Sequence, residues 1–372
     1  MKILALEAYY GGSHKAFLDG WIANSRHDWT LLTLPPNKWK WRMRNSAVAF
    51  ADQVNDSLSK GNSWDVIFCS DMLNLAEFKG LVDKSVSDMT SVVYFHENQL
   101  TYPNRFESER DYQYVMTNLT TALAADYVWF NSAFHRDEFL TAMTAFLKRM
   151  PESEPIDPAE RIKPKSAVYP PGIARIDTSA KKQKPAGPLR ILWAARWEHD
   201  KNPDDFFAAL KIVKEMGIDF RLSVIGERFS DEPEVFVWAE EFFAENIDRW
   251  GFQETRADYE AALLDADVIV STANHEFFGV TVAEAISAGA YPVLPERLAY
   301  PEIIRNIAPE SPGEFFYDGT IKGLAEKLIA LCETIAITGL WGDNPNRGIW
   351  SMKLLHWPTR ARIMDNDLED LK

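Results

Sequence analysis

The feature that most constrains this chain is a double series of short apolar runs separated by longer stretches with helical spacing. Runs that are nearly continuous rather than alternating are typical of strands buried on both faces of a parallel sheet. The first series is "ILALEA", "WTLLTL", "DVIFCS", "SVVYF", "DYVWF" and "SAVYP", and the second is "LRILWAA", "FRLSVIG", "ADVIVS" and "AYPVLP". This alternation predicts an α/β chain with two doubly wound domains.

A polar segment, "GIARIDTSAKKQKPAGP", separates the two series. It contains Pro and Gly and lacks apolar periodicity, as interdomain linkers do. With 372 residues, the chain is long enough for two domains that each bury a core. We therefore predict an N-terminal domain over 1–175, a linker over 176–187, a C-terminal domain over 188–349, and a helical tail over 350–372 that packs back on the N-terminal domain.

Charge is divided unequally between the two halves of the chain. The net charge is −15, yet residues 1–185 hold 22 basic and 22 acidic residues, whereas the remainder holds 18 and 33. A uniformly acidic protein would repel nucleic acid. A neutral half with concentrated basic stretches can still bind a polyanion locally.

Several classes of protein are disfavoured by the composition. No apolar run approaches the ~18 residues of a membrane span, and "MKILALEAYYGG" lacks the form of a signal peptide, so we expect no membrane partner. Cys69 and Cys332 stand far apart in apolar contexts, which favours reduced thiols in the cytoplasm. The seven histidines occur singly without zinc spacing, so we expect no metal.

The most informative motif is "STANHEFFGVTVAEAISAGAYPVLP", residues 271 to 295. A strand ends, a loop carries Glu276 and Gly279, and a helix carries Glu284. Free backbone N–H groups and the helix dipole at residues 278 to 281 favour an anion, and Gly279 lets the backbone approach a phosphate. Glu284 can accept hydrogen bonds from a ribose hydroxyl pair. The alternative is an ordinary strand-loop-helix with two surface acids.

This stretch resembles the E-x(7)-E motif of the retaining glycosyltransferases of family 4. The resemblance implies the GT-B fold, in which two doubly wound (Rossmann-like) domains face a central cleft, with Glu276 at the donor sugar and Glu284 at the ribose. Supporting motifs are "LWAARWEHDKNPDDF" with Arg196 and Lys201, "EAYYGGSHKAF" with a helix N-cap at Ser13, and "VIGERF" with Gly226 and Glu227. The implied donor-binding residues are Gly11, Gly12, Arg196, Lys201, Gly226, Glu276, Phe278, Gly279, Val280 and Glu284.

The family resemblance also implies a mechanism without a metal ion. Arg196 and Lys201 hold the leaving phosphate, and Glu276 and His96 orient the sugar, so these four are the candidate catalytic residues. The departing phosphate oxygen takes the proton of the attacking hydroxyl. Asp265 and Asp267 imitate a D-x-D metal motif, but they stand at a helix-to-strand junction, and we interpret them as structural.

The stretch "PPNKWKWRMRN" alternates cations with Trp39, Trp41 and Met43, so that an extended chain would have one cationic and one apolar face. Such a ribbon can contact phosphates and stack on a base. The alternative is a strand or loop with core tryptophans and solvated cations. A second basic set brackets the linker and is either an extension of this track or solvated linker; it comprises Arg161, Lys163, Lys165, Lys181, Lys182 and Lys184.

Three N-terminal stretches, "LEAYYGGSHK", "LPPNKWKWRMRNSA" and "FHENQLTYP", resemble a narrower family, the tRNA-queuosine α-mannosyltransferases. This resemblance spans essentially the whole chain. It implies transfer of mannose from GDP-mannose to the cyclopentenediol of queuosine at an anticodon wobble position, so the expected partners are GDP-mannose and queuosine-containing tRNA. The implied acceptor-binding residues are His14, Lys38, Trp39, Lys40, Trp41, Arg42, Arg44, Glu97 and Asn98.

Other functions remain open from the sequence. One is a family 4 glycosyltransferase that acts on a lipid, a polysaccharide or a small metabolite. Another is a catalytically inactive RNA-binding protein with a GT-B fold, and a GT-B epimerase or phosphorylase is a third. Donor turnover separates the enzymes from the inactive binding protein.

Overall fold

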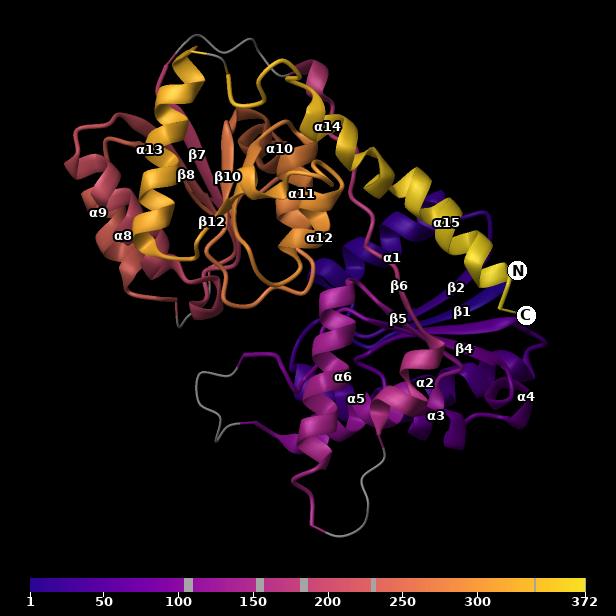
Figure 1. Cartoon of the computed structure of the whole chain (residues 1–372). Helices are drawn as coiled ribbons and strands as arrows, with labels where there is room; N and C mark the ends of the chain where they lie inside the picture. The colour runs from indigo at the N-terminus through magenta and orange to yellow at the C-terminus, as the bar shows by residue number, and fades with distance from the viewer. Residues whose placement is uncertain (104–109, 152–156, 181–186, 229–231, 338, 372) are drawn as a thin grey trace. The chain divides into compact units, whose positions relative to one another are not determined.

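The structure is a computed structural model of the chain, and it describes residues 1–103, 110–151, 157–180, 187–228, 232–337 and 339–371. The chain divides into two compact units (Figure 1). Unit 1 comprises residues 1–172 and the segment from Trp357 to the C-terminus, and unit 2 comprises residues 173–356. The chain therefore passes from one unit to the other twice.

Unit 1 is built on a parallel sheet with the strand order β2-β1-β3-β4-β5-β6 among the described residues. The strands are β1 (Lys2–Glu7), β2 (Asp28–Thr33), β3 (Val66–Ser70), β4 (Thr90–Phe95), β5 (Tyr127–Phe130) and β6 (Ser166–Val168). Strands β3 and β4 in the middle of the sheet are buried nearly throughout, as their continuous apolar sequences predict.

Helices cover both faces of this sheet. One core contains side chains of α2 (Trp39–Ser59), α3 (Leu75–Leu81), α5 (Tyr112–Ala124) and α6 (Ala133–Leu147). The other core contains side chains of α1 (Gly12–Asn24) and α15 (Trp357–Glu369). The short elements α4 (Lys84–Ser87) and α7 (Pro158–Arg161) complete the helices of unit 1 among the described residues.

The C-terminal helix α15 packs against α1 within unit 1 (Figure 1). Trp357 lies against Gly20 and Gly172, where a Cβ atom would overlap its indole ring. The buried carboxylate of Asp365 accepts hydrogen bonds from Trp21 Nε1 at 2.8 Å and from Ser25 Oγ at 2.9 Å. The segment from Trp357 thus belongs to the core of unit 1, whereas residues 350–356 lie in unit 2.

Unit 2 repeats the architecture with the strand order β12-β11-β10-β7-β8-β9, again parallel among the described residues. The strands are β7 (Leu189–Ala194), β8 (Phe220–Ile225), β9 (Ile247–Gly251), β10 (Val268–Val270), β11 (Tyr291–Pro295) and β12 (Phe316–Tyr317). The helices are α8 (Pro203–Glu215), α9 (Val235–Phe242), α10 (Arg256–Asp265), α11 (Val280–Ser287), α12 (Tyr300–Arg305), α13 (Ile321–Ile337) and α14 (Arg347–Ser351).

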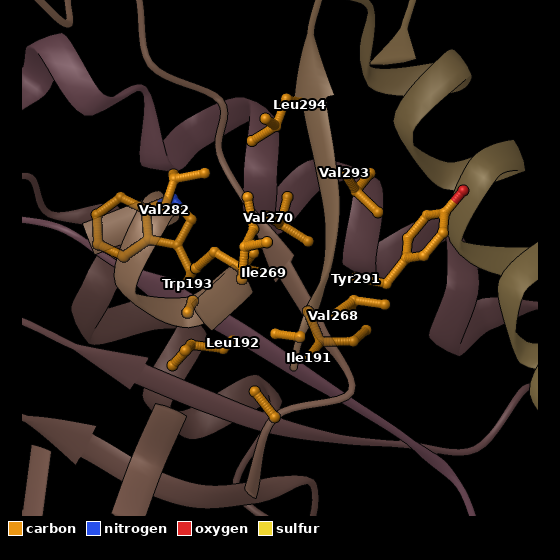
Figure 2. Close-up of a cluster of buried hydrophobic side chains, with 14 of the residues drawn as sticks. Ile191, Leu192, Trp193, Val268, Ile269, Val270, Val282, Tyr291, Val293 and Leu294 are labelled. Atoms are coloured by element: carbon orange, nitrogen blue, oxygen red, sulfur yellow. The ribbon is translucent and has the colours of Figure 1, made fainter. Parts of the chain in front are cut away.

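The core of unit 2 lies around its central strands. Figure 2 shows buried side chains of β7, β10 and β11 together with Val282 of α11. Because β10 pairs with both β7 and β11, the loops that follow these three strands lie along one edge of the sheet. Open α/β sheets bind ligands at that edge. Strands β9 and β12 are additions to the sequence-based prediction, which did not include them.

Candidate active site

The candidate site of unit 1 lies where β1, β3 and β4 end. Glu7, the last residue of β1, is 1% exposed. One of its carboxylate oxygens accepts hydrogen bonds from Tyr9 N at 2.8 Å and Ser70 Oγ at 2.9 Å, and the other lies 3.2 Å from His14 Nδ1. The imidazole ring of His14 lies over that of His96, with the ring centroids 4.0 Å apart. Three strand ends therefore hold a compact set of ionisable side chains.

Asp71, which follows β3, is the fourth ionisable member of this set. Its side chain is completely buried, and Oδ1 accepts a hydrogen bond from His96 N at 2.8 Å. Its Oδ2 atom is buried without a hydrogen-bond partner among the described residues. Asn118 of α5 donates a hydrogen bond to the Asp71 carbonyl at 3.1 Å. The loop after β3 is therefore fixed to both β4 and α5.

The two neighbouring histidines, His14 and His96, differ in charge state. Burial on its own would lower the pKa of His14, but the charge and hydrogen bond of Glu7, assisted by Asp71, raise that pKa to about 9. Burial and the neighbouring charge of His14 lower the pKa of His96 well below its ordinary value. Burial raises the pKa of the Asp71 carboxyl to about 8. Near neutral pH, His14 is charged, whereas His96 and Asp71 are neutral.

Glu7, His14 and His96 also have the geometry of a possible cation site. Each offers one ligand atom, and these atoms lie within 4.8 Å of one another. Two imidazoles and a carboxylate suit a divalent transition metal. However, the Glu7 contact that keeps His14 protonated opposes metal binding, because a metal requires neutral imidazole.

One prediction for unit 1, the helix N-cap at Ser13, is wrong, and another stays a prediction. Asn98 is completely buried, and its side chain bonds to the backbone of Leu100 and Thr101, so it builds its own turn; its contact with an acceptor stays a prediction. Ser13 is not a helix N-cap, because α1 begins at Gly12 with Gly11 in the capping position. Glu97 stays half-buried next to the site and accepts a hydrogen bond from Gln99 Nε2 at 3.0 Å.

The segment "PPNKWKWRMRN" is not an extended ribbon, because α2 begins at Trp39. On a helix, residues four apart share a face, so the alternating pattern does not separate cations from apolar groups. Met43 is buried in the core, whereas Trp41 is 58% exposed. Arg42 turns back and donates to Pro35 O at 3.0 Å and Asn37 Oδ1 at 3.0 Å. Lys38, which has φ of +51°, precedes the helix.

One described member of the second basic set, Lys165, has a structural contact. The Lys165 ammonium group donates to the carbonyls of Leu123, at 2.9 Å, and Ala125, which lie at the C-terminal end of α5. This contact satisfies carbonyls that the helix leaves unpaired, so Lys165 is structural. Lys181, Lys182 and Lys184 lie outside the described residues.

In unit 2, Lys201 lies at the centre of the candidate site. It is 8% exposed, and its Nζ atom lies 2.8 Å from His275 O, 3.1 Å from Asp200 Oδ2 and 3.4 Å from Glu276 Oε2. Burial on its own would lower the pKa of Lys201, but Glu276 and Asp200 raise it. The ammonium group is therefore charged and fixed beside Glu276. Arg196, in the same loop after β7, pairs with Glu198 at 3.1 Å.

Hydrogen bonds to backbone carbonyls join the loop after β7 to the loop after β10. Thr272 Oγ1 donates to Lys201 O at 2.9 Å, and Asn274 N donates to Asp200 O at 2.8 Å. Arg297, after β11, donates to the carbonyls of Ala273 and Thr272 at 3.1 and 3.0 Å. The sequence reasoning missed Arg297, and its single basic side chain gave no signal for this role.

The start of α11 has a backbone geometry that favours an anion. Gly279 precedes it with φ of +95°, a conformation that favours glycine. Val280 begins the helix, so backbone N–H groups of its first turn have no partner within the helix. The Phe278 side chain is buried in the core of unit 2, which leaves its backbone as the part that can face a ligand.

Glu284 lies inside α11, and both of its carboxylate oxygens are engaged. Oε1 lies 3.0 Å from Arg256 Nη2, and Oε2 accepts a hydrogen bond from Tyr259 OH at 2.7 Å. Each oxygen retains a further lone pair for a ligand hydroxyl. Burial and the charge of Glu284 raise the pKa of Tyr259 well above its ordinary value, so Tyr259 stays a donor. The sequence located this helix but not these two partners of Glu284.

Two further predictions concern loops of unit 2. Gly226 follows β8, where a Cβ atom would overlap the Ala195 carbonyl, so only glycine allows the two loops to approach. Asp267 Oδ2 accepts a hydrogen bond from Arg190 N at 2.9 Å, and Asp265 pairs with Arg249 at 2.7 Å. Both aspartates therefore have partners within the fold.

The fold and the sequence of unit 2 define the class of protein. Residues 175–334 match the sequence model described as "Glycosyl transferases group 1", and the two parallel sheets are those of the GT-B fold. The chain is a glycosyltransferase. Residues 2–173 match the model described as "tRNA-queuosine alpha-mannosyltransferase N-terminal". The chain belongs to the tRNA-queuosine alpha-mannosyltransferase family.

A curated relative and two solved structures illustrate these similarities. The tRNA-queuosine alpha-mannosyltransferase of Drosophila melanogaster is 37% identical over 340 residues, which cover 89% of this chain and 86% of the relative. A sucrose-phosphate synthase from Thermosynechococcus elongatus has a TM-score of 0.72 at 14% identity, covering 100% of this chain and 99% of that one. Anabaena HepE in complex with UDP has a TM-score of 0.68 at 15% identity, covering 100% of both chains. The two structures support the fold alone.

No helix among the described residues is long and apolar enough to cross a membrane.

Proposed function

We propose that this chain transfers mannose from GDP-mannose to queuosine in tRNA, with retention of the anomeric configuration, without a metal ion, and in the cytoplasm. The observation that carries the proposal is the family match of the N-terminal half, because that half of a GT-B enzyme selects the acceptor and the match is specific to queuosine mannosyltransferases. The curated relative with the same name supports the same acceptor and the same sugar.

The donor half supports a nucleotide-sugar substrate. The Lys201 ammonium, together with Arg196, supplies positive charge where the diphosphate leaves. The first turn of α11 offers backbone N–H groups to the same phosphates, and Glu284 offers carboxylate oxygens to the ribose. These fixed charges support departure of the diphosphate without a metal ion.

The reaction balances with these groups alone. The bond between the sugar C1 and the phosphate oxygen breaks, and a new bond forms between C1 and a hydroxyl oxygen of the acceptor on the same face. The hydroxyl proton passes to the departing phosphate oxygen, and GDP is released. Glu276, half-buried beside Lys201, stabilises positive charge that develops on the sugar ring.

The ionisable residues Glu7, His14, Asp71 and His96, which we call the unit 1 cluster, support recognition of a hydroxylated acceptor. Charged His14 is a hydrogen-bond donor, whereas neutral His96 has one nitrogen that accepts. A site with both roles suits a cis-diol such as the cyclopentenediol of queuosine. The free thiols Cys69 and Cys332 support a reducing compartment, as in the cytoplasm.

The test is mass spectrometry of nucleosides from tRNA that has been incubated with the purified protein. Queuosine-containing tRNA and the same tRNA without queuosine are each combined with GDP-mannose or with other nucleotide sugars. We expect one hexose on queuosine, from GDP-mannose only, and an α-linkage when the product is analysed by NMR. Lys201→Ala should abolish the product, whereas the matched surface variant Lys211→Ala on α8 should form it normally.

Two outcomes would contradict parts of this proposal. Slow hydrolysis of one donor with no RNA product would overturn the acceptor and leave a glycosyltransferase for a different acceptor. Binding of tRNA with no turnover of any donor would overturn the enzymatic activity itself.

A further inference from the structure

Unit 1 carries an exposed surface on which aromatic and basic side chains alternate. We call it the aromatic–basic strip and define it by six residues from the beginning of α2, the beginning of α5 and the segment just after α6: Trp39, Lys40, Trp41, Arg44, Tyr112 and Arg149. The first four belong to the segment that the sequence singled out. Tyr112 and Arg149 were not predicted, because they are distant from that segment in the sequence.

Buried aromatic rings support the strip from below. The Trp39 ring lies 5.1 Å from the ring of buried Tyr114, and the Arg44 guanidinium lies 5.3 Å from the same ring. Tyr112 stacks on Phe146 at 5.1 Å with an interplanar angle of 21°. Because Phe146 is buried, this stack fixes the orientation of a largely exposed ring. The strip is thus a supported surface and not a set of unrelated side chains.

Cations accompany the aromatic rings along the strip. Lys40 lies 5.5 Å from the Trp39 ring, and Arg149 lies 5.7 Å from the Phe146 ring. Asp111 lies 3.8 Å from Arg44 and neutralises part of this charge. Lys38 and Lys148 are exposed next to the strip and add to its positive charge. This density of cations contrasts with the net charge of −15 for the whole chain.

The exposure of the aromatic rings requires an explanation. Trp41 is 58% exposed, Tyr112 is 41% exposed and Trp39 is 36% exposed. Exposed aromatic side chains next to cations suit unpaired nucleotides, because bases stack on the rings while phosphates bind the cations. A protein partner would also use Trp, Tyr and Arg, but the excess of cations favours a polyanion.

We infer that the aromatic–basic strip binds unpaired anticodon-loop nucleotides next to the nucleotide that is modified; this inference rests on the proposed function. Helix α5 connects the two places. Asn118 donates a hydrogen bond to the carbonyl of Asp71 in the unit 1 cluster, and Tyr112 lies six residues earlier on the same helix. Six helical residues rise ~9 Å, so the strip begins a short distance from the cluster. Neighbouring nucleotides of one loop can occupy both.

The experiment compares single variants of the full-length protein with a matched control. Trp41→Ala and Tyr112→Ala each remove a stacking ring, and Lys40→Ala and Arg149→Ala each remove a cation. The control is Trp238→Ala in unit 2, since Trp238 is 39% exposed and lies outside the strip. Binding of a queuosine-containing anticodon stem-loop is measured by fluorescence anisotropy at several salt concentrations, with KM for tRNA measured in parallel.

We expect each ring variant to weaken RNA binding about 5- to 100-fold, because stacking on one ring contributes that much per base. Each cation variant should reduce the slope of log K against log salt by about 0.7, the value for one phosphate contact on a single strand. Trp238→Ala should bind RNA as the wild type does. Thermal unfolding of every variant identifies any that fails to fold. Only the strip variants that fold are then used to judge RNA binding.

The possible outcomes distinguish failure of the strip inference from failure of the proposed function. If wild-type protein modifies tRNA and folded strip variants bind RNA like the control, the strip inference is wrong and the function stands. If the strip variants change sedimentation of the protein but not RNA binding, the strip is a protein contact and the inference is again wrong. If wild-type protein neither binds nor modifies any tRNA, both proposals fail.

Discussion

The two units use charge in different ways at their candidate site residues. In unit 2, Lys201 is surrounded by acceptors, and its charge is fixed in place by Asp200 and Glu276. In unit 1, Glu7 and His14 form an ion pair, but Asp71 and His96 beside them are neutral near pH 7. Unit 2 thus stabilises a constant charge, whereas unit 1 holds protons that can move with pH.

The largest expected effect comes from breaking the fixed charge in unit 2. Lys201→Ala removes the ammonium group that we propose faces the departing phosphate, and it leaves Asp200 and Glu276 without their cation. We expect kcat to fall about 100- to 1000-fold, in the range found when one transition-state donor is lost. Steady-state rates with GDP-mannose and queuosine-containing tRNA measure this effect. A fall in kcat of less than tenfold for Lys201→Ala, with the kcat of Lys211→Ala unchanged, would contradict the proposed contact between Lys201 and the phosphate.

The second prediction concerns the titrating pair in unit 1. The folded-state pKa of His14 is about 9, above its ordinary value of 6.5, so protonated His14 stabilises the fold fully below about pH 6.5. This stabilisation is lost as pH rises through 9. A shift of this size corresponds to about 3 kcal/mol. Glu7→Gln should therefore remove about 3 kcal/mol from the free energy of unfolding at pH 6, and much less at pH 9.5.

Urea unfolding at both pH values measures this difference. Glu160→Gln, a variant of an exposed carboxylate on α7, is the control and should leave the pH dependence of the wild type unchanged. Curves for the wild type and Glu7→Gln that run parallel from pH 6 to pH 9.5 would show that Glu7 does not hold the proton on His14.

A smaller effect is expected at Glu284, the proposed ribose contact. Glu284→Gln keeps the shape of the side chain but loses the charge that Arg256 and Tyr259 contact. We expect KM for the donor to rise about tenfold with a smaller change in kcat, because a ribose contact acts mainly on binding. Glu260→Gln is the matched control, since Glu260 also pairs with Arg256 but lies further toward solvent. Equal KM values for the two variants would contradict the ribose assignment.

The smallest expected effect comes from chelation. If the charges of Lys201 and Arg196 suffice for the leaving group, treatment with EDTA should change turnover by less than about twofold. Turnover is compared before and after dialysis against the chelator. Loss of turnover that is restored by one divalent metal would instead point to Glu7, His14 and His96 as its ligands, because their ligand atoms lie within 4.8 Å of one another.

Much of the fold could be predicted from the sequence because the central strands are continuous apolar runs. Strand β12 was missed because it has only two residues, and β9 because its sequence "IDRWG" mixes charged and apolar residues. The beginning of α2 was interpreted as an extended segment or loop, because the seven residues 38 to 44 alternate between basic and apolar side chains. The spacing of Met43, Ala47, Phe50 and Val54, all buried on one face, was the signal for a helix.

Some of the candidate site residues could likewise be located from the sequence, and others could not. The Glu276 to Glu284 motif is local, so its helix and loop could be located from one short stretch. The unit 1 cluster joins Glu7, Ser70 and His96 from three strand ends, and the sequence shows neither their pairing nor their distances. A carboxylate that ends a buried strand, as Glu7 does, was the available signal. That signal did not reveal which histidine would pair with the Glu7 carboxylate.

The place of α15 has a consequence for how the protein is made. The face of unit 1 that carries Trp21 is completed by Trp357 and Asp365, which are synthesised long after the rest of unit 1. At 5–20 residues per second, synthesis of the chain between Gly172 and Trp357 takes roughly 10 to 40 s. During that interval an apolar face of unit 1 is exposed to solvent. We therefore expect a chain truncated before Trp357 to leave this face exposed and to bind chaperones instead of forming a shorter active enzyme.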